Sequence, residues 1–214
     1  QMVQKLGVAI DLPAGPSEVL VMADETANAH FVASDLLSQA EHGADSQVML
    51  FATNKKIAAD TISAIDSQIE TLPRRNHILK SLESSKVIVL DSLELMVEMA
   101  NEYAPEHLII AMKNAESISE QIVNAGSVFL GNYTPESAGD YASGTNHTLP
   151  TNGYAKAYSG VNLDSFVKKI TYQHITPEGL LKLGNTLLTM AEAECLQAHK
   201  NAVKLRIDEI TKQK

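Results

Sequence analysis

The segment EVLVMA, at Glu18–Ala23, decides the fold class together with the residues that follow it. It is a short apolar run directly after the Pro/Gly turn LPAGPS at Leu12–Ser17, as expected for a buried strand. Apolar residues then recur at helical spacing through Ala29–His42, where Gly43 is placed to end the helix. QVMLF, at Gln47–Phe51, predicts a second buried strand. A strand, a helix and a strand in this order indicate a βαβ unit and a parallel sheet.

The same alternation continues to residue 130. The predicted elements are helices over Ile57–Leu72, within 73–85, over Leu93–Tyr103 and from Asn114 through Ile122, and strands at Lys86–Leu90, Leu108–Ala111 and Ser127–Leu130. Asp91 is expected to cap the third of these helices and Asn114 the fourth. The predicted fold class is therefore α/β, with Rossmann-like, mostly parallel sheet layers.

The pattern changes after Pro150. Residues 151–160 look like a loop, and Thr176-Pro177-Glu178 is a typical helix start. Apolar residues then recur at helical spacing to Ile210 with no further strand, so this C-terminal helical tail must pack on the body or on another subunit. We therefore predict three parts. They are a Rossmann-like unit at 1–105, an α/β segment at 106–150 that completes a second such unit with a catalytic loop, and a dimerisation tail at 151–214.

Composition excludes several classes of function. The formal net charge is −9, with 26 acidic against 17 basic residues, which argues against a nucleic-acid or anionic-membrane surface. No run of apolar residues is long enough to span a membrane, and the first residues lack the pattern of a signal peptide. Cys195 is the only cysteine, which suits a reducing cytoplasm.

Four polar segments carry the candidate chemistry. TPESAGDYASGTNHTLP, at Thr134–Pro150, is rich in glycine and polar groups and predicts a shaped loop rather than a helix or strand. Ser38–Gly43, Tyr103–Leu108 and Ala193–Ala202 each place a carboxylate and an imidazole within a few residues. Such groups, gathered from distant segments, are what a metal or acid–base site needs.

A metal site has candidate ligands in three of these segments. Gln39 and His42 are three residues apart at the end of a predicted helix, so both project to the same side. Asp140 and His199 are the other candidates, and Cys195 with His199, four apart on the tail helix, is an alternative pair. The competing interpretation is that each of these side chains is an ordinary structural or packing group.

Glu106 and His107 are the candidate acid–base pair. They lie where a helix ends at Pro105 and a strand begins, and an adjacent carboxylate and imidazole can divide proton transfers between them. The alternative is an ordinary corner with an exposed pair. Ser17 lacks a nucleophile elbow, so the residues alone assign it no nucleophilic role.

Several blocks together resemble the histidinol dehydrogenase family. They are PAGPSEVLVMAD, ASDLLSQAEHG, YAPEHLII, AGSVFLG, PESAGDYASGTNH, LP and AHKNAV, in the family's order. Members of the family are much longer than this chain, so the resemblance implies that the chain is the C-terminal half. The implied architecture is a truncated, aldehyde dehydrogenase-like one.

The resemblance implies a zinc-containing, NAD-dependent enzyme that oxidises L-histidinol through L-histidinal to L-histidine. His107 would take the proton of the alcohol, and Glu106 would help water attack the aldehyde. The implied zinc ligands are Gln39, His42, Asp140 and His199. Further implied substrate contacts are Ser17, His147 and Glu194, beside His107 and the metal ligands themselves.

The resemblance also implies an intertwined, cytoplasmic homodimer whose tail supplies residues to the partner's site. Its NAD contacts would lie mainly in the absent half, so the chain alone is expected to be inactive. Two other functions remain open. One is a non-catalytic module that binds zinc or a ligand and dimerises, and the other is a metal-assisted hydrolase in which Glu106 activates water.

Overall fold

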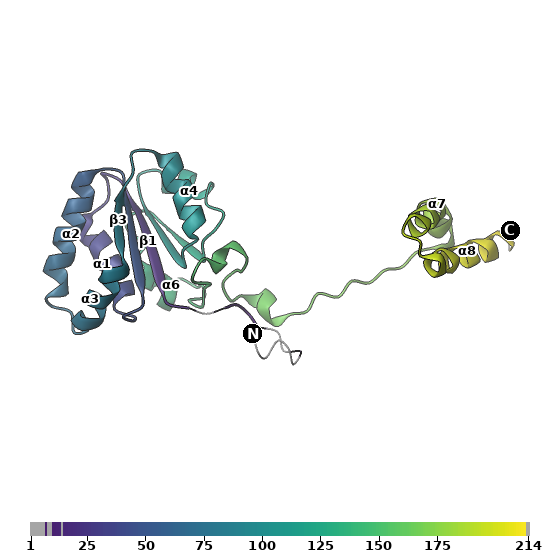
Figure 1. The fold of residues 1–214 in the computed structure, drawn as a ribbon, viewed down its shortest axis with the longest axis horizontal. Helices are drawn as coiled ribbons and strands as arrows, with labels where there is room; N and C mark the ends of the chain where they lie inside the picture. The colour runs from purple at the N-terminus through teal and green to yellow at the C-terminus, as the bar shows by residue number, and fades with distance from the viewer. Residues whose placement is uncertain (1–6, 8–9, 14, 213–214) are drawn as a thin grey trace. The chain divides into compact units, whose positions relative to one another are not determined.

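The computed structural model describes residues 7, 10–13 and 15–212. The chain forms two compact units, the first extending to Val167 and the second beginning at Lys168 (Figure 1). The first unit contains a five-stranded sheet with helices, and the second contains two helices. In the described residues, no helix combines the length and the apolar character needed to cross a bilayer.

The sheet is parallel throughout. Its strands are β1 (Glu18–Ala23), β2 (Gln47–Ala52), β3 (Lys86–Val89), β4 (His107–Ala111) and β5 (Ser127–Leu130). Their order is β3-β2-β1-β4-β5, so β1 is central, and Val19 of β1 pairs with His107 of β4. The predicted α/β class with a mostly parallel sheet is confirmed.

Helices cover both faces of the sheet (Figure 1). They are α1 (Ala29–Ala40), α2 (Lys55–Ile69), α3 (Arg75–Ser84), α4 (Leu93–Tyr103), α5 (Ala115–Ser119) and α6 (Glu136–Tyr141). Val19 and Val21 of β1 face the core formed with α1 to α3, whereas Leu20 and Met22 face the core formed with α4 and α5. Both faces of β1 are therefore buried, which explains its continuous apolar run.

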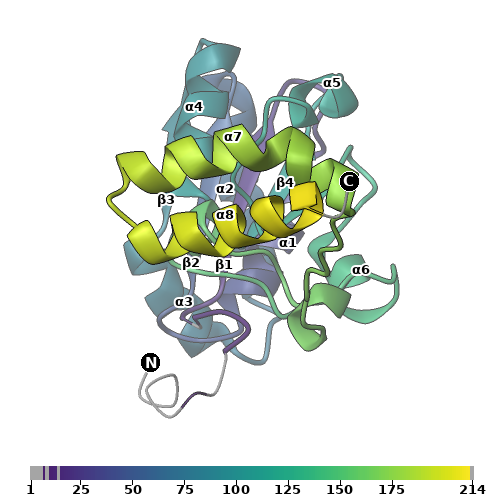
Figure 2. The same cartoon turned by 90° about the vertical axis from the view of Figure 1, so that its right-hand side faces the viewer.

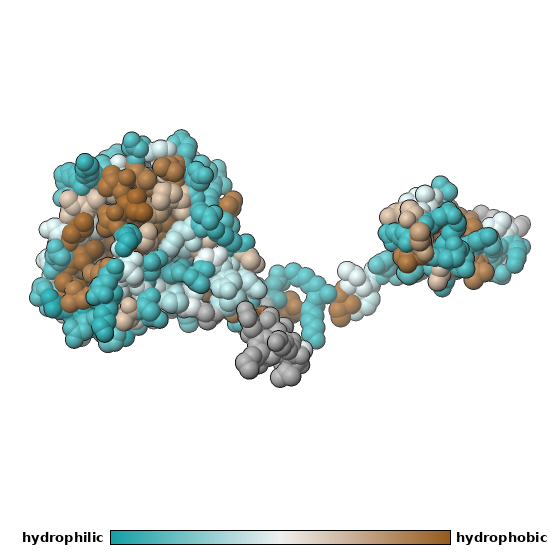
Figure 3. Space-filling view, viewed as in Figure 1, coloured by the Kyte–Doolittle hydropathy of each residue, from teal (hydrophilic) through white to brown (hydrophobic). Residues whose placement is uncertain are grey.

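The edge strand β3 is much less buried than the centre of the sheet. Val87 and Val89 keep 39% and 42% of their surface exposed, whereas Val19 and Val21 keep none. Figure 3 shows apolar surface on the side of the first unit where β3 faces the viewer. An edge strand with exposed apolar side chains can pair with the edge of another chain, so β3 favours aggregation.

Two predicted helix caps differ from the structure. Ser92, not Asp91, is the N-cap of α4, because its hydroxyl accepts from the backbone N–H of Leu95 at 3.2 Å. Asn114 occupies the N-cap position of α5, but its side chain makes no capping hydrogen bond. α5 also ends before Ile122, where the chain turns with hydrogen bonds between residues three apart.

The prediction of a loop over 134–150 is wrong for residues 136–141, which form α6. Pro135 restricts the backbone at the N-cap position, and the N–H groups of Ala142 and Ser143 close the far end on the Ala138 carbonyl. Gly139 is buried against Phe129, where a Cβ would lie 2.6 Å from the ring. The helix therefore depends on a tertiary contact as well as on local sequence.

Residues beyond the sheet remain in the first unit as far as Val167. They include two short 3₁₀ helices, Tyr154–Lys156 and Leu163–Phe166. The predicted segments 1–105 and 106–150 contribute strands to a single sheet, and the first unit continues past residue 150. How domains divide in a complete protein stays a prediction.

The second unit is a pair of packed helices, α7 (Pro177–Ala193) and α8 (Gln197–Lys212), seen side by side in Figure 2. The predicted start at Thr176 is confirmed, since its hydroxyl accepts from the N–H of Gly179 at 3.1 Å. Cys195 has a φ of 59° in the turn between the helices. The prediction that Cys195 and His199 share one helix is therefore wrong.

Candidate functional site

The candidate site lies at the N-terminal ends of the parallel strands. Glu18 is the first residue of β1, and His107 is the first residue of β4. Gln39 lies in the last turn of α1, and His42 lies in the turn beyond it rather than in the predicted helix. α6 supplies Asp140. The parallel pairing of β1 with β4 thus brings together residues that are far apart in sequence.

His107 is buried, and its two ring nitrogens have different surroundings. Nδ1 lies 3.1 Å from the main-chain oxygen of Glu18, and because a carbonyl only accepts, Nδ1 carries the proton. Nε2 is buried, lies 3.6 Å from Oδ1 of Asp140, and has no hydrogen-bond partner in the described part of the chain. Burial lowers the pKa of His107, outweighing the opposing effects of Glu18 and Asp140. The neutral ring therefore presents a lone pair to the site.

Glu106 is the second titratable group of the predicted pair. Its Oε2 accepts a hydrogen bond from the N–H of Glu18 at 2.8 Å and lies 3.6 Å from Nδ1 of His107. Burial is the main cause that raises the pKa of Glu106 to about 7, with repulsion from Glu18 and Asp140 adding to it. Glu106 and His107 are 6% and 3% exposed, so the alternative of an exposed pair at a corner is wrong. The carboxyl group of Glu106 can therefore exchange protons near neutral pH.

Three side chains converge as a group that can hold a metal ion. His42, Glu136 and Asp140 each offer one ligand atom, and these atoms lie within 4.8 Å of one another. His42 and Asp140 are predicted ligands, and the structure brings them together. Glu136 belongs to the polar segment at 134–150, but the sequence assigns it no role. Its spacing of four residues from Asp140 is the available signal, because that spacing puts both carboxylates on one side of a helix.

Gln39, another predicted ligand, is fully buried at 0% exposure. With its amide nitrogen facing Glu136, it donates to both carboxylate oxygens, and the contact to Oε2 is 2.9 Å. Its amide oxygen then accepts from the N–H of Glu18 at 3.1 Å. Hydrogen bonds therefore connect Glu106, the N–H of Glu18, Gln39 and Glu136 in one network.

Carboxyl groups crowd this site. Burial is the main cause that raises the pKa of Glu136 to about 9, followed by repulsion from Asp140, Asp35 and Glu106. Burial likewise raises the pKa of Asp35 to about 7, and it raises the pKa of Glu18. A cation would relieve this repulsion. Imidazole, carboxylate and amide groups also form a donor set that fits zinc.

Gln39, His42, Glu106, His107, Glu136 and Asp140 together form the acid–base cluster, and the other predicted site residues are not part of it. Ser17 is half-buried immediately before β1, and His147 is exposed in the segment after α6. Glu194 and His199 belong to the second unit, where both line a surface pocket of about 250 Å³. The structure thus brings those two together, and their contribution to a site in a partner subunit stays a prediction.

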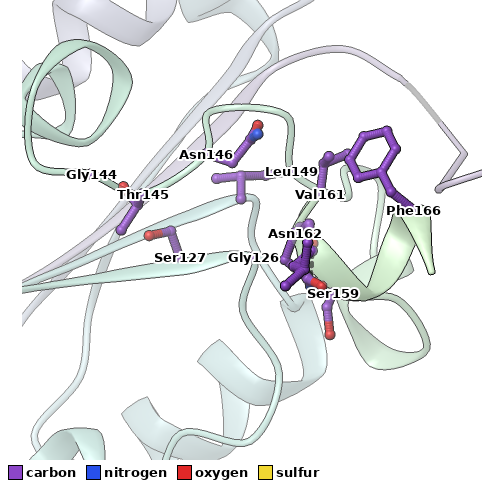
Figure 4. A pocket seen from close by; sticks show the side chains of 12 residues that line it. Gly126, Ser127, Gly144, Thr145, Asn146, Leu149, Ser159, Val161, Asn162 and Phe166 are labelled. Carbon is purple, nitrogen blue, oxygen red and sulfur yellow. Dashed lines mark hydrogen bonds between the residues drawn. The ribbon is translucent and has the colours of Figure 1, made fainter.

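A separate cavity of about 710 Å³ adjoins the start of β5. Figure 4 shows the side chains around it, which come from three segments and include Ser127, Asn146, Val161 and Phe166. Its lining contains neither imidazole nor carboxylate. This cavity and the acid–base cluster are therefore different features of the first unit.

Comparisons with known proteins agree on one family. The histidinol dehydrogenase family model matches residues 1–207. Curated histidinol dehydrogenases from Bacteroides thetaiotaomicron and Bacteroides fragilis are 58% and 59% identical over 97% and 99% of this chain, and 49% and 50% of their own length is covered. The crystal structure of histidinol dehydrogenase from Elizabethkingia anophelis matches with a TM-score of 0.95 at 58% identity, covering 98% of this chain and 48% of that one.

The chain thus spans about half the length of the relatives it matches. The matches extend over almost the whole of the chain, and they include the strands and helices that carry the candidate site. The resemblance drawn from the sequence blocks is confirmed, and the chain belongs to the histidinol dehydrogenase family.

Proposed function

We propose that the complete protein containing this chain oxidises L-histidinol through L-histidinal to L-histidine, with NAD as the oxidant and zinc in the site. The observation that carries the proposal is His107, a buried neutral imidazole whose Nε2 has no hydrogen-bond partner among the described residues and lies 3.6 Å from Oδ1 of Asp140. Family membership supports the choice of substrate.

His107 is the proposed general base of the first oxidation. The Glu18 carbonyl holds the proton on Nδ1, so Nε2 can accept the hydroxyl proton of the alcohol. NAD, when bound, would supply the oxidant for this step as a hydride acceptor. The lowered pKa of His107 keeps the ring unprotonated and ready for this step near neutral pH.

Glu106 is the proposed proton-transfer group of the second oxidation. An aldehyde must add water before a second hydride can leave, and a carboxylate can take a proton from that water. The pKa of about 7 means that both protonation states of Glu106 are accessible near neutral pH. The backbone N–H of Glu18 holds the carboxylate in place by donating a hydrogen bond to Oε2.

Gln39, His42 and Asp140 are the proposed zinc ligands in this chain, with His199 supplied by the tail of a partner subunit. When bound, zinc supplies coordination positions that hold the imidazole and amino nitrogens of the substrate and so orient its carbinol carbon. Ser17, His147 and Glu194 are proposed to contact the substrate. The crowded carboxylates around Glu136 support binding of cations at this place.

The remaining properties concern the complete protein. We propose a cytoplasmic homodimer with exchanged tails and an aldehyde dehydrogenase-like architecture. Most NAD contacts are assigned to the part of the protein outside this chain, so the chain alone is expected to lack turnover.

The test is an assay of NADH formation from L-histidinol, run on the complete polypeptide and on this chain, both loaded with zinc. We expect NADH from the complete polypeptide and none from the chain alone. A complete polypeptide that binds zinc but forms no NADH would refute the enzyme proposal and favour a non-catalytic binding module.

A further inference from the structure

Glu136 is a buried carboxyl group to which the proposed mechanism assigns no task. It is the first residue of α6 and only 1% exposed, although its neighbour Ser137 is exposed. Burying a carboxyl group is costly unless it has polar partners. Its polar partner among the described residues is the side-chain amide of Gln39, so the question is what this contact does.

The contact determines which end of the Gln39 amide faces which neighbour. In its ionised form, which a cation bound beside it favours, Glu136 only accepts hydrogen bonds, so it selects the NH₂ end of the amide, which donates to both of its oxygens. The amide oxygen is thereby turned away from Glu136 and accepts from the N–H of Glu18 at 3.1 Å. An amide oxygen has two lone pairs, so one remains for a second partner.

The orientation matters because the two ends of the amide differ toward a cation. The oxygen can ligate a metal ion, whereas the NH₂ group carries only donors and cannot. Gln39 is fully buried, so bulk water does not reach either end of its amide. His42 and Asp140 lie beside the same carboxylate, within the 4.8 Å group that it completes.

We propose that Glu136 is a positioning residue that holds the Gln39 amide with its oxygen, rather than its nitrogen, available to zinc. This inference rests on the proposed function for the identity of the metal. In this proposal Glu136 acts through Gln39 rather than as a zinc ligand itself. Such outer partners of a metal ligand commonly change metal affinity about 10- to 100-fold.

The first experiment is a double-mutant cycle on the complete protein, with zinc affinity measured by competition with a chelator in the absence of substrate and NAD. The variants are Glu136→Gln, Gln39→Ala and the double variant. Glu136→Gln keeps the volume but lets the Gln39 amide be satisfied in either orientation, so we expect affinity to fall about 10- to 100-fold. In the Gln39→Ala background the same change should shift affinity by no more than about twofold.

Additive losses in this cycle would overturn the proposal, because they would mean that Glu136 binds zinc itself or acts by another route. Absence of zinc binding by the unaltered protein would overturn it as well. Glu116→Gln is the matched control, since Glu116 is also in the first turn of a short helix but is exposed. It should leave zinc affinity unchanged.

A second variant guards against misfolding of the first. Exchanging the pair, as Gln39→Glu with Glu136→Gln, puts a carboxylate at position 39, and a carboxylate offers oxygen in either orientation. The exchanged protein should therefore regain most of the affinity lost in Glu136→Gln, and an exchanged protein as weak as Glu136→Gln would contradict the inference. Because this readout is zinc affinity and the test of the proposed function is NADH formation, either can fail while the other stands.

Discussion

Nδ1 of His107 lies 3.1 Å from the main-chain oxygen of Glu18, on the neighbouring strand. The tautomer of this side chain is therefore set by the pairing of β1 with β4, in which Val19 is opposite His107. A shift of one residue in this register would move the imidazole to the other face of the sheet. The backbone carbonyl of Glu18 therefore determines which ring nitrogen of His107 carries the proton.

Replacing His107 by asparagine should abolish proton transfer without removing a proposed zinc ligand. We expect kcat of the complete protein to fall about 10²- to 10⁴-fold, the usual contribution of a general base. Zinc content, measured by metal analysis of the same preparation, should stay at the wild-type level. Loss of the metal together with activity would show that His107 is itself part of the metal site.

Glu106 should make stability depend on pH. Its folded-state pKa of about 7 is above the ordinary value of 4.5, so the folded chain favours the protonated form. The contribution of Glu106 to stability is therefore fully present below about pH 4.5 and is lost as pH rises through about 7.

Glu106→Gln cannot ionise, so its stability relative to wild type should rise across this window. The gain should be at most about 3.5 kcal/mol, from about 1.4 kcal/mol per pKa unit. Urea unfolding of both proteins at several pH values measures the difference. Parallel stability curves would show that Glu106 titrates normally in the folded state.

Gly139→Ala should displace α6. A Cβ there would lie 2.6 Å from the ring of Phe129, and this ring is 6% exposed and packs against His107 with ring centroids 5.9 Å apart. Overpacking of this kind costs about 1–3 kcal/mol.

In Gly139→Ala, the midpoint of thermal unfolding and the zinc affinity should both be lower than in wild type. Ser137→Ala, at an exposed position of the same helix, is the control and should leave both nearly unaltered. Equal behaviour of the two variants would mean that α6 tolerates a side chain against Phe129.

Val89→Lys on the edge strand β3 should reduce self-association of the chain. Val89 is 42% exposed at a sheet margin, and a lysine there opposes pairing between edges. Light scattering against concentration should show less aggregation than for wild type. Val123→Lys, at a position 76% exposed outside the sheet, should have no such effect, and equal improvement by both would point to net charge instead.

The sequence by itself determined the strands, most helices and the fold class. EVLVMA, QVMLF and LIIA, the last at Leu108–Ala111, are continuous apolar runs because both faces of a central parallel strand are buried, and such runs are visible locally. The start of α7 at Thr176 is equally local, since a hydroxyl, a proline and the helix follow in order. The family blocks are likewise contiguous runs of residues, and they include the two proposed catalytic residues, Glu106 and His107.

Only the tertiary structure decided the environment of those residues. Burial of Glu106 and His107, and the free Nε2, follow from strand pairing and from packing of α6, which no local pattern encodes. The sequence does not predict helix α6 because its glycine-containing segment has weak helix propensity, and it forms against Phe129. The role of Glu136 is not predicted for the same reason. This carboxyl group lies in a polar segment and becomes a buried partner of Gln39 only when α1 and α6 meet. Desolvation and hydrogen bonding depend on such contacts between distant segments.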